Sequence, residues 1–360
     1  MKLILLPALR RLLRHRSAVQ LGTDPGRATV VEFTDPRHIG MLDLLDGTRT
    51  AGRAALDAAR FGLGHAEALR VIELLRQAGV LTDPAALSPA DLPEGARRLL
   101  ASEAGALSLR ARPDDRTPAQ LLRRRHAASV LVSGYGRLAA AVATMLGAAG
   151  VGHIELAVTG RVTGADLAVG GLRPADLGRP RAIAAADAVR RAAPHTTVGP
   201  LHGTTPELAI LVGAPRPDPV TALRYARRHC PHLTVWFRDG SVVLGPLVRP
   251  RLSSCLDCLD LHRQDRDPQW PLLARQLATC PDREEPAEAG LVGFAAGLAA
   301  MQALCHLDGG VPDTVGGTLE LTVPGRIRRR NWAPHPRCGC VRRATGLRRT
   351  GSEAGGTMAE

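Results

Sequence analysis

Apolar positions from residue 126 onward alternate between short strand-like runs and stretches with helical spacing. Three runs have the length and composition of buried strands: ASVLVSG, VGHIELAV and ELAILVG. The stretches after them carry apolar residues at helical intervals: GRLAAAVATMLGAAG, GRPRAIAAADAVRRAAP and PVTALRYARRHC. Strands that alternate with helices form parallel pairs joined by crossovers. The pattern therefore predicts an α/β fold with a Rossmann-like, mixed and mainly parallel sheet.

The C-terminal third departs from this alternation. LTVWFRDGSVVLGPLV predicts a hairpin that turns at Asp239-Gly240, and TLELTVPGRIRRRNW predicts a closing hairpin. Between the hairpins, EEPAEAGLVGFAAGLAAMQALCHLDGG predicts a long apolar helix.

The first 90 residues have a different pattern. HRSAVQLGTDPGRATVVEF predicts two short strands around a turn, and three helical stretches follow: HIGMLDLLDGTRT, AGRAALDAARFGL and HAEALRVIELLRQAGVLTD. Asp46-Gly47-Thr48 is interpreted as a helix stop followed by a new helix start. The pattern predicts a small winged helix-turn-helix-like α+β domain. Such a domain binds DNA through a helix, or an extended peptide by strand addition at a sheet edge.

Composition changes suggest where the domains end. The segment 84–100 is rich in Pro and Ala, which indicates a boundary. We therefore expect a recognition domain over 1–90, a linker over 91–125, a Rossmann-type domain over 126–344, and a flexible polar tail over 345–360. A chain of 360 residues is long enough for two such domains.

The formal net charge of +13 comes almost entirely from arginine. A well-solvated basic surface or an acidic peptide partner accounts for it. Nucleic acid is an unlikely partner, because no basic motif is interleaved with aromatic residues. The sequence contains no run of 18 or more apolar residues, the length that a membrane-spanning helix needs. The N-terminal MKLILLPALRRLLRHR lacks a small-residue cleavage site, so we expect a cytoplasmic protein with reduced thiols.

Two close cysteine pairs carry the strongest chemical signal in the chain. They are Cys255 and Cys258 in SSCLDCLDL, and Cys338 and Cys340 in HPRCGC. Four thiolates in two knuckles are typical of a closed structural Zn²⁺ site. Free thiols and a disulfide are the alternatives, and His335 is a substitute ligand if the tighter pair supplies only one sulfur. The three remaining cysteines are interpreted as small buried apolar residues: Cys230, Cys280 and Cys305.

A glycine pair follows the first strand of the Rossmann-type region. Gly134 and Gly136 in VSGYGRLAAA stand between a strand and a helix, where a nucleotide phosphate would meet a helix N-terminus. The third glycine of the usual fingerprint is replaced by Ala139. A tight strand-to-helix turn without a ligand is the favoured explanation of the pair.

The order of these elements resembles the ThiF/MoeB/HesA superfamily, bacterial relatives of ubiquitin-activating enzymes. GAAGVGHIELAV is similar to the family's sequence after the first helix. Two further segments resemble one group within the family, the ThiF-like proteins that bind leader peptides for YcaO-type cyclodehydratases. These segments are VVLGPLVRPRLSSCLDCLDLHRQDRDPQWPLL and HPRCGC. The resemblance implies that residues 1–90 are a peptide recognition element. It also implies a homodimer formed through the Rossmann-like domain.

Active members of this superfamily adenylate a C-terminal carboxylate with ATP and Mg²⁺, and several of their residues are missing here. The strand-end acids are replaced by Val158 and Gly160, and the Asn and Arg that reach the phosphates are replaced by Asp166 and by Val169 or Gly170. Arg181 stands for the family lysine, and Asp218 is the nearest candidate for the metal-binding acid. Binding of ATP and Mg²⁺ is therefore doubtful, and no residue is assigned as catalytic.

Three functions follow. The first is a zinc-stabilised scaffold with a degraded ATP site, which binds a precursor peptide and presents it to a YcaO-type or other ATP-using modification enzyme. The second is an active adenylyltransferase for a ubiquitin-like or peptide substrate, in which Cys280 is a candidate acyl acceptor. The third is a DNA-binding regulator. His262, Asp265 and Asp267 are interpreted as helix caps and partners of arginines.

Overall fold

The computed structural model describes residues 1–110, 116–135, 137–213, 217, 219–279 and 286–340. Contacts divide the chain into two compact units. The first unit contains residues 1–127 and 148–150, and the second contains residues 128–147 and 151–360.

The first unit contains two small antiparallel sheets. One has the strand order β5-β1-β6 and the other the order β2-β3-β4. Their bounds are β1 Lys2–Leu5, β2 Arg11–His15, β3 Ala18–Leu21, β4 Thr29–Glu32, β5 Asp46–Thr50 and β6 Leu81–Thr82. The expected turn between the two strands is confirmed, because β3 pairs with β4 in antiparallel register from Ala18 opposite Glu32.

Three helices pack with these strands: α1 Arg37–Met41, α2 Ala51–Asp57 and α3 His65–Gln77. Short 3-10 turns follow the first two, at η1 Leu42–Leu44 and η2 Ala58–Phe61. In α3, Ala68, Val71, Ile72 and Leu75 recur at helical intervals and are buried in one core with the strands. The interpretation of Asp46-Gly47-Thr48 as a helix stop and start is wrong, because these residues begin strand β5. Gly47 has a φ of 87°, a positive value that glycine adopts far more readily than other residues, and the β1–β5 register is irregular beside it.

The segment expected to be a linker contains regular structure. After α4 Pro84–Leu87 come α5 Glu94–Leu99, α6 Ala101–Ser108 and α7 Pro118–Ala127. Leu92, Leu100, Leu107 and Leu122 are buried together in a small core of their own. The Pro and Ala content of this stretch favoured a linker, although its leucines have the spacing of amphipathic helices.

The second unit is built on an eight-stranded sheet with the order β14-β13-β12-β11-β10-β7-β8-β9. The strands are β7 Ser129–Gly134, β8 His153–Val158, β9 Thr197–Val198, β10 Leu208–Val212, β11 His232–Arg238, β12 Ser241–Val248, β13 Gly317–Thr322 and β14 Arg326–Asn331. The five strands from β11 to β9 are parallel, and the three others are antiparallel to their neighbours. The predicted mixed, mainly parallel α/β sheet is confirmed.

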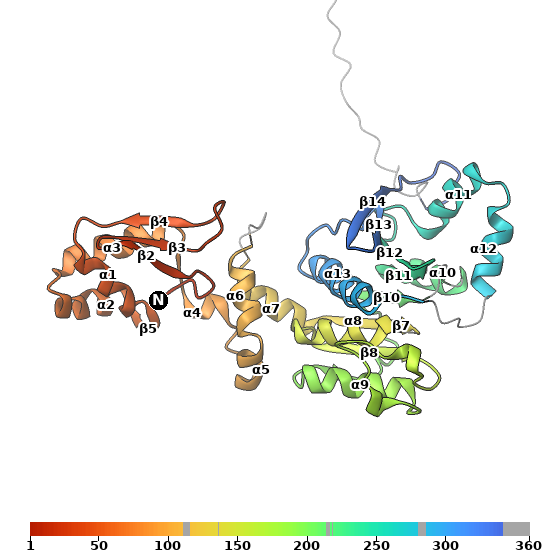
Figure 1. Ribbon diagram of the computed structural model, residues 1–360, viewed down its shortest axis with the longest axis horizontal. Helices are drawn as coiled ribbons and strands as arrows, with labels where there is room; N and C mark the ends of the chain where they lie inside the picture. The colour runs from red at the N-terminus through yellow and green to blue at the C-terminus, as the bar shows by residue number, and fades with distance from the viewer. Residues whose placement is uncertain (111–115, 136, 214–216, 218, 280–285, 341–360) are drawn as a thin grey trace, which may run out of the picture. The chain divides into compact units, whose positions relative to one another are not determined.

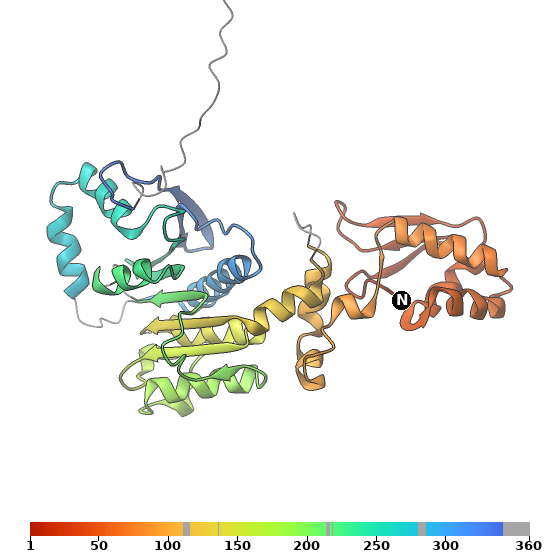
Figure 2. The ribbon, with the colours of Figure 1, turned by 180° about the vertical axis from the view of Figure 1, so that it is seen from behind.

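Helices cover this sheet, as the sequence pattern predicted. They are α8 Arg137–Ala148, α9 Arg181–Ala192, α10 Pro219–Arg227, α11 Leu256–Arg266, α12 Trp270–Thr279 and α13 Ala289–Leu307, with 3-10 turns η3 Gly164–Asp166 and η4 Pro174–Asp176. Strands β10, β7 and β8 lie side by side, and α9 packs against β8 (Figure 1). Helices α11 and α12 lie together in both views (Figures 1 and 2).

Helix α13 is long and apolar enough to cross a membrane by length and hydropathy alone. However, 56% of its most apolar window is buried inside the protein, where it packs against β12 and β13. Core helices have this combination of hydropathy and burial. The expectation of a cytoplasmic location remains a prediction.

Candidate functional site

The four predicted zinc ligands come together in the second unit. Cys255 precedes α11 and Cys258 lies in its first turn, while Cys338 and Cys340 follow β14. Neighbouring sulfurs are 3.3 to 3.8 Å apart, and all four lie within 4.8 Å of one another. Tetrahedral zinc with bonds of about 2.3 Å holds thiolate sulfurs about 3.8 Å apart. This cluster, which we call the cysteine cluster, therefore fits a structural Zn²⁺ ion.

Local electrostatics favour a thiolate in the cysteine cluster. Hydrogen bonds from the Cys255 thiol and from the backbone N–H of His335 lower the pKa of Cys258 to about 4, although burial opposes the shift. The N-terminus of α11 also favours negative charge at this position. Burial and the neighbouring thiols raise the pKa of Cys340 to about 12. Without a cation the cluster therefore holds few negative charges, whereas a bound divalent cation would stabilise the remaining thiolates.

A substitute ligand is not needed, because Cys338 and Cys340 both join the cluster, and the side chain of His335 has other partners. Its Nε2 lies 2.8 Å from Asp265 Oδ2, and its Nδ1 accepts a hydrogen bond from the Arg337 N–H at 3.1 Å. Only the backbone N–H of His335 reaches a sulfur, that of Cys258 at 3.3 Å. The side chain therefore supports the segment that carries Cys338 and does not bind the metal.

His262, Asp265 and His335 form a second group whose ligand atoms lie within 4.8 Å of one another. Because Nδ1 of His335 accepts from an N–H, its Nε2 carries the proton and donates to Asp265. His262 Nε2 lies 2.9 Å from the carbonyl oxygen of Ala333, and Asp265 also pairs with Arg337. The hydrogen bond from His335, followed by the charge of Arg337, lowers the pKa of Asp265. This group is a hydrogen-bonded brace beside the cysteine cluster, as the sequence interpretation of Asp265 expected.

The predicted nucleotide loop is explained in part by packing within the sheet. Gly134 ends β7 with a φ of 126°, and a Cβ atom there would lie 1.9 Å from the carbonyl oxygen of Val212 in β10. Only glycine fits this close approach. Gly136 lies outside the described residues, as do Cys280 and Asp218. The glycine at 134 is therefore required by the fold whether or not a phosphate binds.

Arg181, the predicted cofactor-binding cation, makes contacts inside the protein. Its Nη2 lies 3.0 Å from Asp166 Oδ2, and its Nη1 donates to the Thr159 carbonyl at 2.7 Å. Asp166 also accepts a hydrogen bond from the Thr163 N–H at 2.8 Å, which fixes the carboxylate at the start of η3. The side chain of Asp166 is 3% exposed and that of Arg181 is 14% exposed. Arg181 is therefore neutralised by a neighbouring carboxylate.

The pairing of Asp166 with Arg181 was not predicted from the sequence. Asp166 was considered only as the replacement of a family asparagine. Thr163-x-x-Asp166 has the spacing of a reciprocal N-terminal cap, a signal that predicts the hydrogen bond from Thr163 to this carboxylate but not its pairing with Arg181. A nearby arginine, Arg179, also pairs internally, with Asp176 at 2.6 Å and Asp187 at 2.5 Å.

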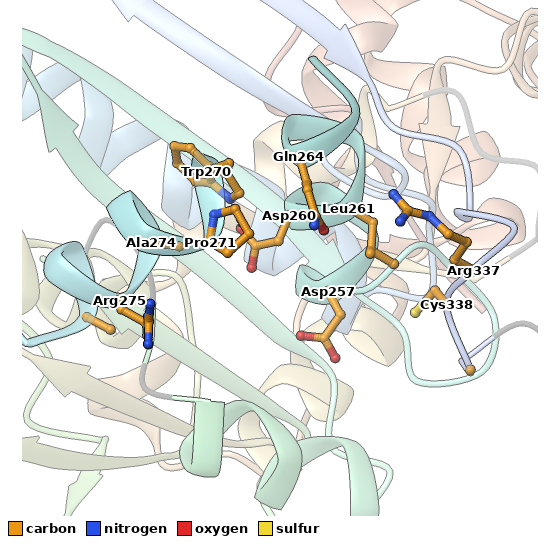
Figure 3. A pocket seen from close by; sticks show the side chains of 12 residues that line it. Asp257, Asp260, Leu261, Gln264, Trp270, Pro271, Ala274, Arg275, Arg337 and Cys338 are labelled. Atoms are coloured by element: carbon orange, nitrogen blue, oxygen red, sulfur yellow. The ribbon is translucent and has the colours of Figure 1, made fainter. Parts of the chain in front are cut away.

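A pocket of about 510 Å³ lies between α11, α12 and the cysteine cluster. Figure 3 shows Trp270 and Pro271 on one side of it and Arg337 and Cys338 on another. Trp270 Nε1 donates to Asp260 Oδ1 at 2.9 Å, which fixes the indole against α11. The lining includes neither Gly134 nor Arg181. The pocket is therefore separate from the predicted nucleotide site.

Comparisons with known proteins agree with this architecture. The ThiF family profile matches residues 114–211, and a search of curated proteins gives no match. The fold is similar to that of Escherichia coli MccB solved with MccA-N7isoASN, at 14% identity and a TM-score of 0.64, covering 95% of this chain and 99% of that one. PaaA is similar at 16% identity and a TM-score of 0.65, covering 91% of this chain and 99% of PaaA.

These identities are low, so the two structures establish the fold and not the activity. The family match falls on the strand and helix alternation from which the resemblance was drawn. The cysteine cluster and the mixed sheet agree with that resemblance. Residues 114–211 therefore match the ThiF family, and the fold of the chain is similar to the folds of MccB and PaaA.

Proposed function

We propose that this protein is a scaffold that binds a ribosomally made precursor peptide and presents it to a separate ATP-using modification enzyme, of the YcaO type or another class. In this proposal residues 1–90 hold the leader segment of the peptide, and the ThiF-type unit docks the enzyme. The Zn²⁺ ion of the cysteine cluster has a structural role only.

The internal pairing of Arg181 is the observation that carries this proposal. Adenylation requires cations aimed at the phosphates, because charge develops there in the transition state. Arg181 instead satisfies Asp166 and the Thr159 carbonyl. Moving it to a phosphate would leave a buried carboxylate unpaired, which is strongly unfavourable. Val169, at a position matching the family's phosphate-contacting residues, is 82% exposed and has no group that could replace that contact.

Strand β2 supports the peptide-binding half of the proposal. It pairs only with β3, so its other edge is open among the described residues. All five of its residues are exposed, and Leu13 is 67% exposed. An extended peptide can add to such an edge through backbone hydrogen bonds, with side chains giving specificity. Arg14 on β2 favours a peptide with acidic residues, whereas Arg11 pairs with Asp43 at 2.7 Å.

A similar fold is associated with a peptide in the solved neighbours. The microcin C7 biosynthetic enzyme MccB was solved in complex with N-formylated MccA. That likeness supports peptide binding as a function of this architecture.

An active adenylyltransferase is the second candidate function. MccB has also been solved with ATP and with AMPCPP, on a fold with TM-scores of 0.62 and 0.65 to this one. Gly134 keeps the strand-to-helix turn of a nucleotide site. In this case the phosphates would need cations other than Arg181.

Two assays on the full-length, zinc-loaded protein test the proposal. Fluorescence anisotropy with labelled acidic leader-type peptides should show binding. Leu13→Asp should weaken that binding by about tenfold or more, because it puts a charge where the added peptide strand would contact an apolar side chain. Leu99→Asp is the matched control, since Leu99 is an exposed leucine of α5 in the same unit. Pyrophosphate exchange should be absent. Exchange activity would support the adenylyltransferase, and failure of every peptide to bind would contradict the scaffold.

A further inference from the structure

Strand β14 is an open edge of the eight-stranded sheet. Among the described residues it pairs only with β13, in an unbroken antiparallel register. The N–H of Trp332, just after β14, donates to the Gly316 carbonyl at 2.8 Å, and in an antiparallel ladder this places the backbone groups of every second residue on the β13 side. The residues between them are Ile327, Arg329 and Asn331, whose N–H and C=O groups face away from the sheet. These groups form a row that another strand can bind.

The side chains of β14 carry more positive charge than their surroundings neutralise. Four of its six residues are arginines: Arg326, Arg328, Arg329 and Arg330. Glu320 on β13 pairs with Arg330 at 2.6 Å, but the same carboxylate also pairs with Arg238 of β11 at 3.2 Å. One negative charge is therefore shared between two cations on this face of the sheet.

The other arginines of β14 keep their full charge. Arg329 donates to a backbone carbonyl at 2.9 Å and to a side-chain amide oxygen, and neither acceptor is an anion. Arg326 and Arg328 are exposed, and neither pairs with a carboxylate among the described residues. Because side chains alternate along a strand, these two arginines lie on the same face as Arg330 and on the opposite face from Ile327. The edge therefore presents a row of cations at every second position.

The charge and the open backbone together select the class of partner. A second copy of the same edge would be repelled, because arginines would face arginines. Nucleic acid offers phosphates to the arginines, but its backbone has no alternating donors and acceptors for the outward N–H and C=O groups. An extended peptide with acidic residues at every second position fits both features, because its backbone pairs with the edge while its carboxylates lie beside Arg326 and Arg328. The residues between the acids lie beside Ile327, which is 49% exposed and favours an apolar contact.

We propose that the edge of β14 binds an extended acidic segment of a partner protein, which adds as a ninth strand to the eight-stranded sheet. The alternating carboxylates of that segment pair with Arg326 and Arg328, and its backbone bonds to the outward groups of β14. These ion pairs are exposed to solvent, so added salt weakens them. The site lies in the second unit, whereas β2 lies in the first, and the inference depends on neither leader-peptide binding nor ATP binding.

Fluorescence anisotropy with the full-length, zinc-loaded protein and two labelled peptides of equal length tests this inference. One peptide alternates Glu and Val, and the other has the same composition with its Glu and Val residues in separate blocks. The alternating peptide should bind about tenfold more tightly, because only it places carboxylates and apolar side chains on opposite faces of an added strand. Its affinity should fall as the salt concentration rises. Equal affinity of the two peptides would show that charge alone attracts them and would overturn the inference.

A pair of matched variants places the binding on β14. Arg326→Ser/Arg328→Ser should weaken binding of the alternating peptide by about tenfold, because both ion pairs are lost. Arg224→Ser/Arg227→Ser is the control, since it removes the same charge from exposed positions on α10. The control should bind the alternating peptide as wild type does.

Ile327→Pro tests the backbone half of the proposal. The N–H that proline lacks faces away from β13, so this variant should fold, as thermal melting would show, and should no longer bind the alternating peptide. Absence of binding by wild type, or binding that the β14 variants leave intact, overturns the inference. If Leu13→Asp removes the binding instead, the peptide occupies β2, and only the proposal for leader binding is supported.

Discussion

Arg181 and Asp166 form an ion pair that is nearly closed to solvent, with 3.0 Å between Nη2 and Oδ2. The arginine comes from the start of α9 and the aspartate from η3. In the family pattern, the position of Arg181 supplies positive charge to the nucleotide. Here the charge of Arg181 is balanced by Asp166 inside the protein. This ion pair is the structural basis for the proposed loss of adenylation.

Replacement of Arg181 should therefore affect stability. Arg181→Ala leaves the carboxylate of Asp166 buried without its cation, and we expect a loss of about 3 kcal/mol in the free energy of unfolding. Arg173→Ala is the matched control, because that side chain is 57% exposed and lies 3.9 Å from Asp176. Chemical denaturation of both variants measures the difference. Equal small losses would show that the Arg181 pair is not structural.

The cysteine cluster should hold zinc, and its loss should unfold the second unit. Cys258→Ser removes the thiolate that the N-terminus of α11 favours, so metal content should fall from about one ion per chain to none. Cys230→Ser should keep its metal, because Cys230 is buried elsewhere and burial raises the pKa of its thiol to about 11. Elemental analysis and circular dichroism give the two readouts. Full zinc content in Cys258→Ser would contradict the assignment.

Glu320 should make stability depend on pH. Burial raises the pKa of this carboxylate, but the hydrogen bond from Arg330 and the charge of Arg238 outweigh burial and lower it overall. Because the folded pKa is depressed, the stabilisation is present above the unfolded value of about 4.3 and is lost as the pH falls through the folded value.

Glu320→Gln should thus be less stable than wild type at neutral pH, and the difference should shrink in acid. Urea denaturation at several pH values measures it. Glu94→Gln provides the control, since Glu94 is 68% exposed and pairs with Arg98 on the surface of α5. If the difference in unfolding free energy between Glu320→Gln and wild type stayed constant in acid, the ion pairs of Glu320 would not be stabilising.

Gly134→Ala should disrupt the junction of β7 and β10. The new Cβ would collide with the Val212 carbonyl, and the φ of 126° is unfavourable for alanine. We expect a loss of about 3 kcal/mol or more in the free energy of unfolding. Gly52→Ala in α2, where nothing lies within 4 Å, should instead stabilise by about 0.5 kcal/mol. If Gly134→Ala had the same free energy of unfolding as wild type, the backbone at this junction could shift to accommodate the new Cβ.

Elements with strong periodicity could be predicted from the sequence. The alternation in β7, α8 and β8 and the turn at Asp239-Gly240 follow directly from local residue patterns. The convergence of Cys255 and Cys338 was also predictable, because zinc spacing implies contact between distant segments.

Other features depend on tertiary contacts that one sequence does not reveal. Strand β5 forms because Asp46 and Thr50 pair with β1, although the local pattern favoured a helix end. The roles of His335 and Arg181 depend on Asp265 and Asp166, which lie 70 and 15 residues away in sequence. Side-chain partners at such separations are set by the fold and leave no local signal.

Calorimetric titration of the full-length, zinc-loaded protein with Mg-ATP tests the central claim most directly. Because Arg181 is neutralised by Asp166, the account predicts no binding heat at millimolar ATP, while a labelled leader-type peptide still binds the same preparation. Micromolar binding of ATP would contradict the account and would move the adenylyltransferase to first place.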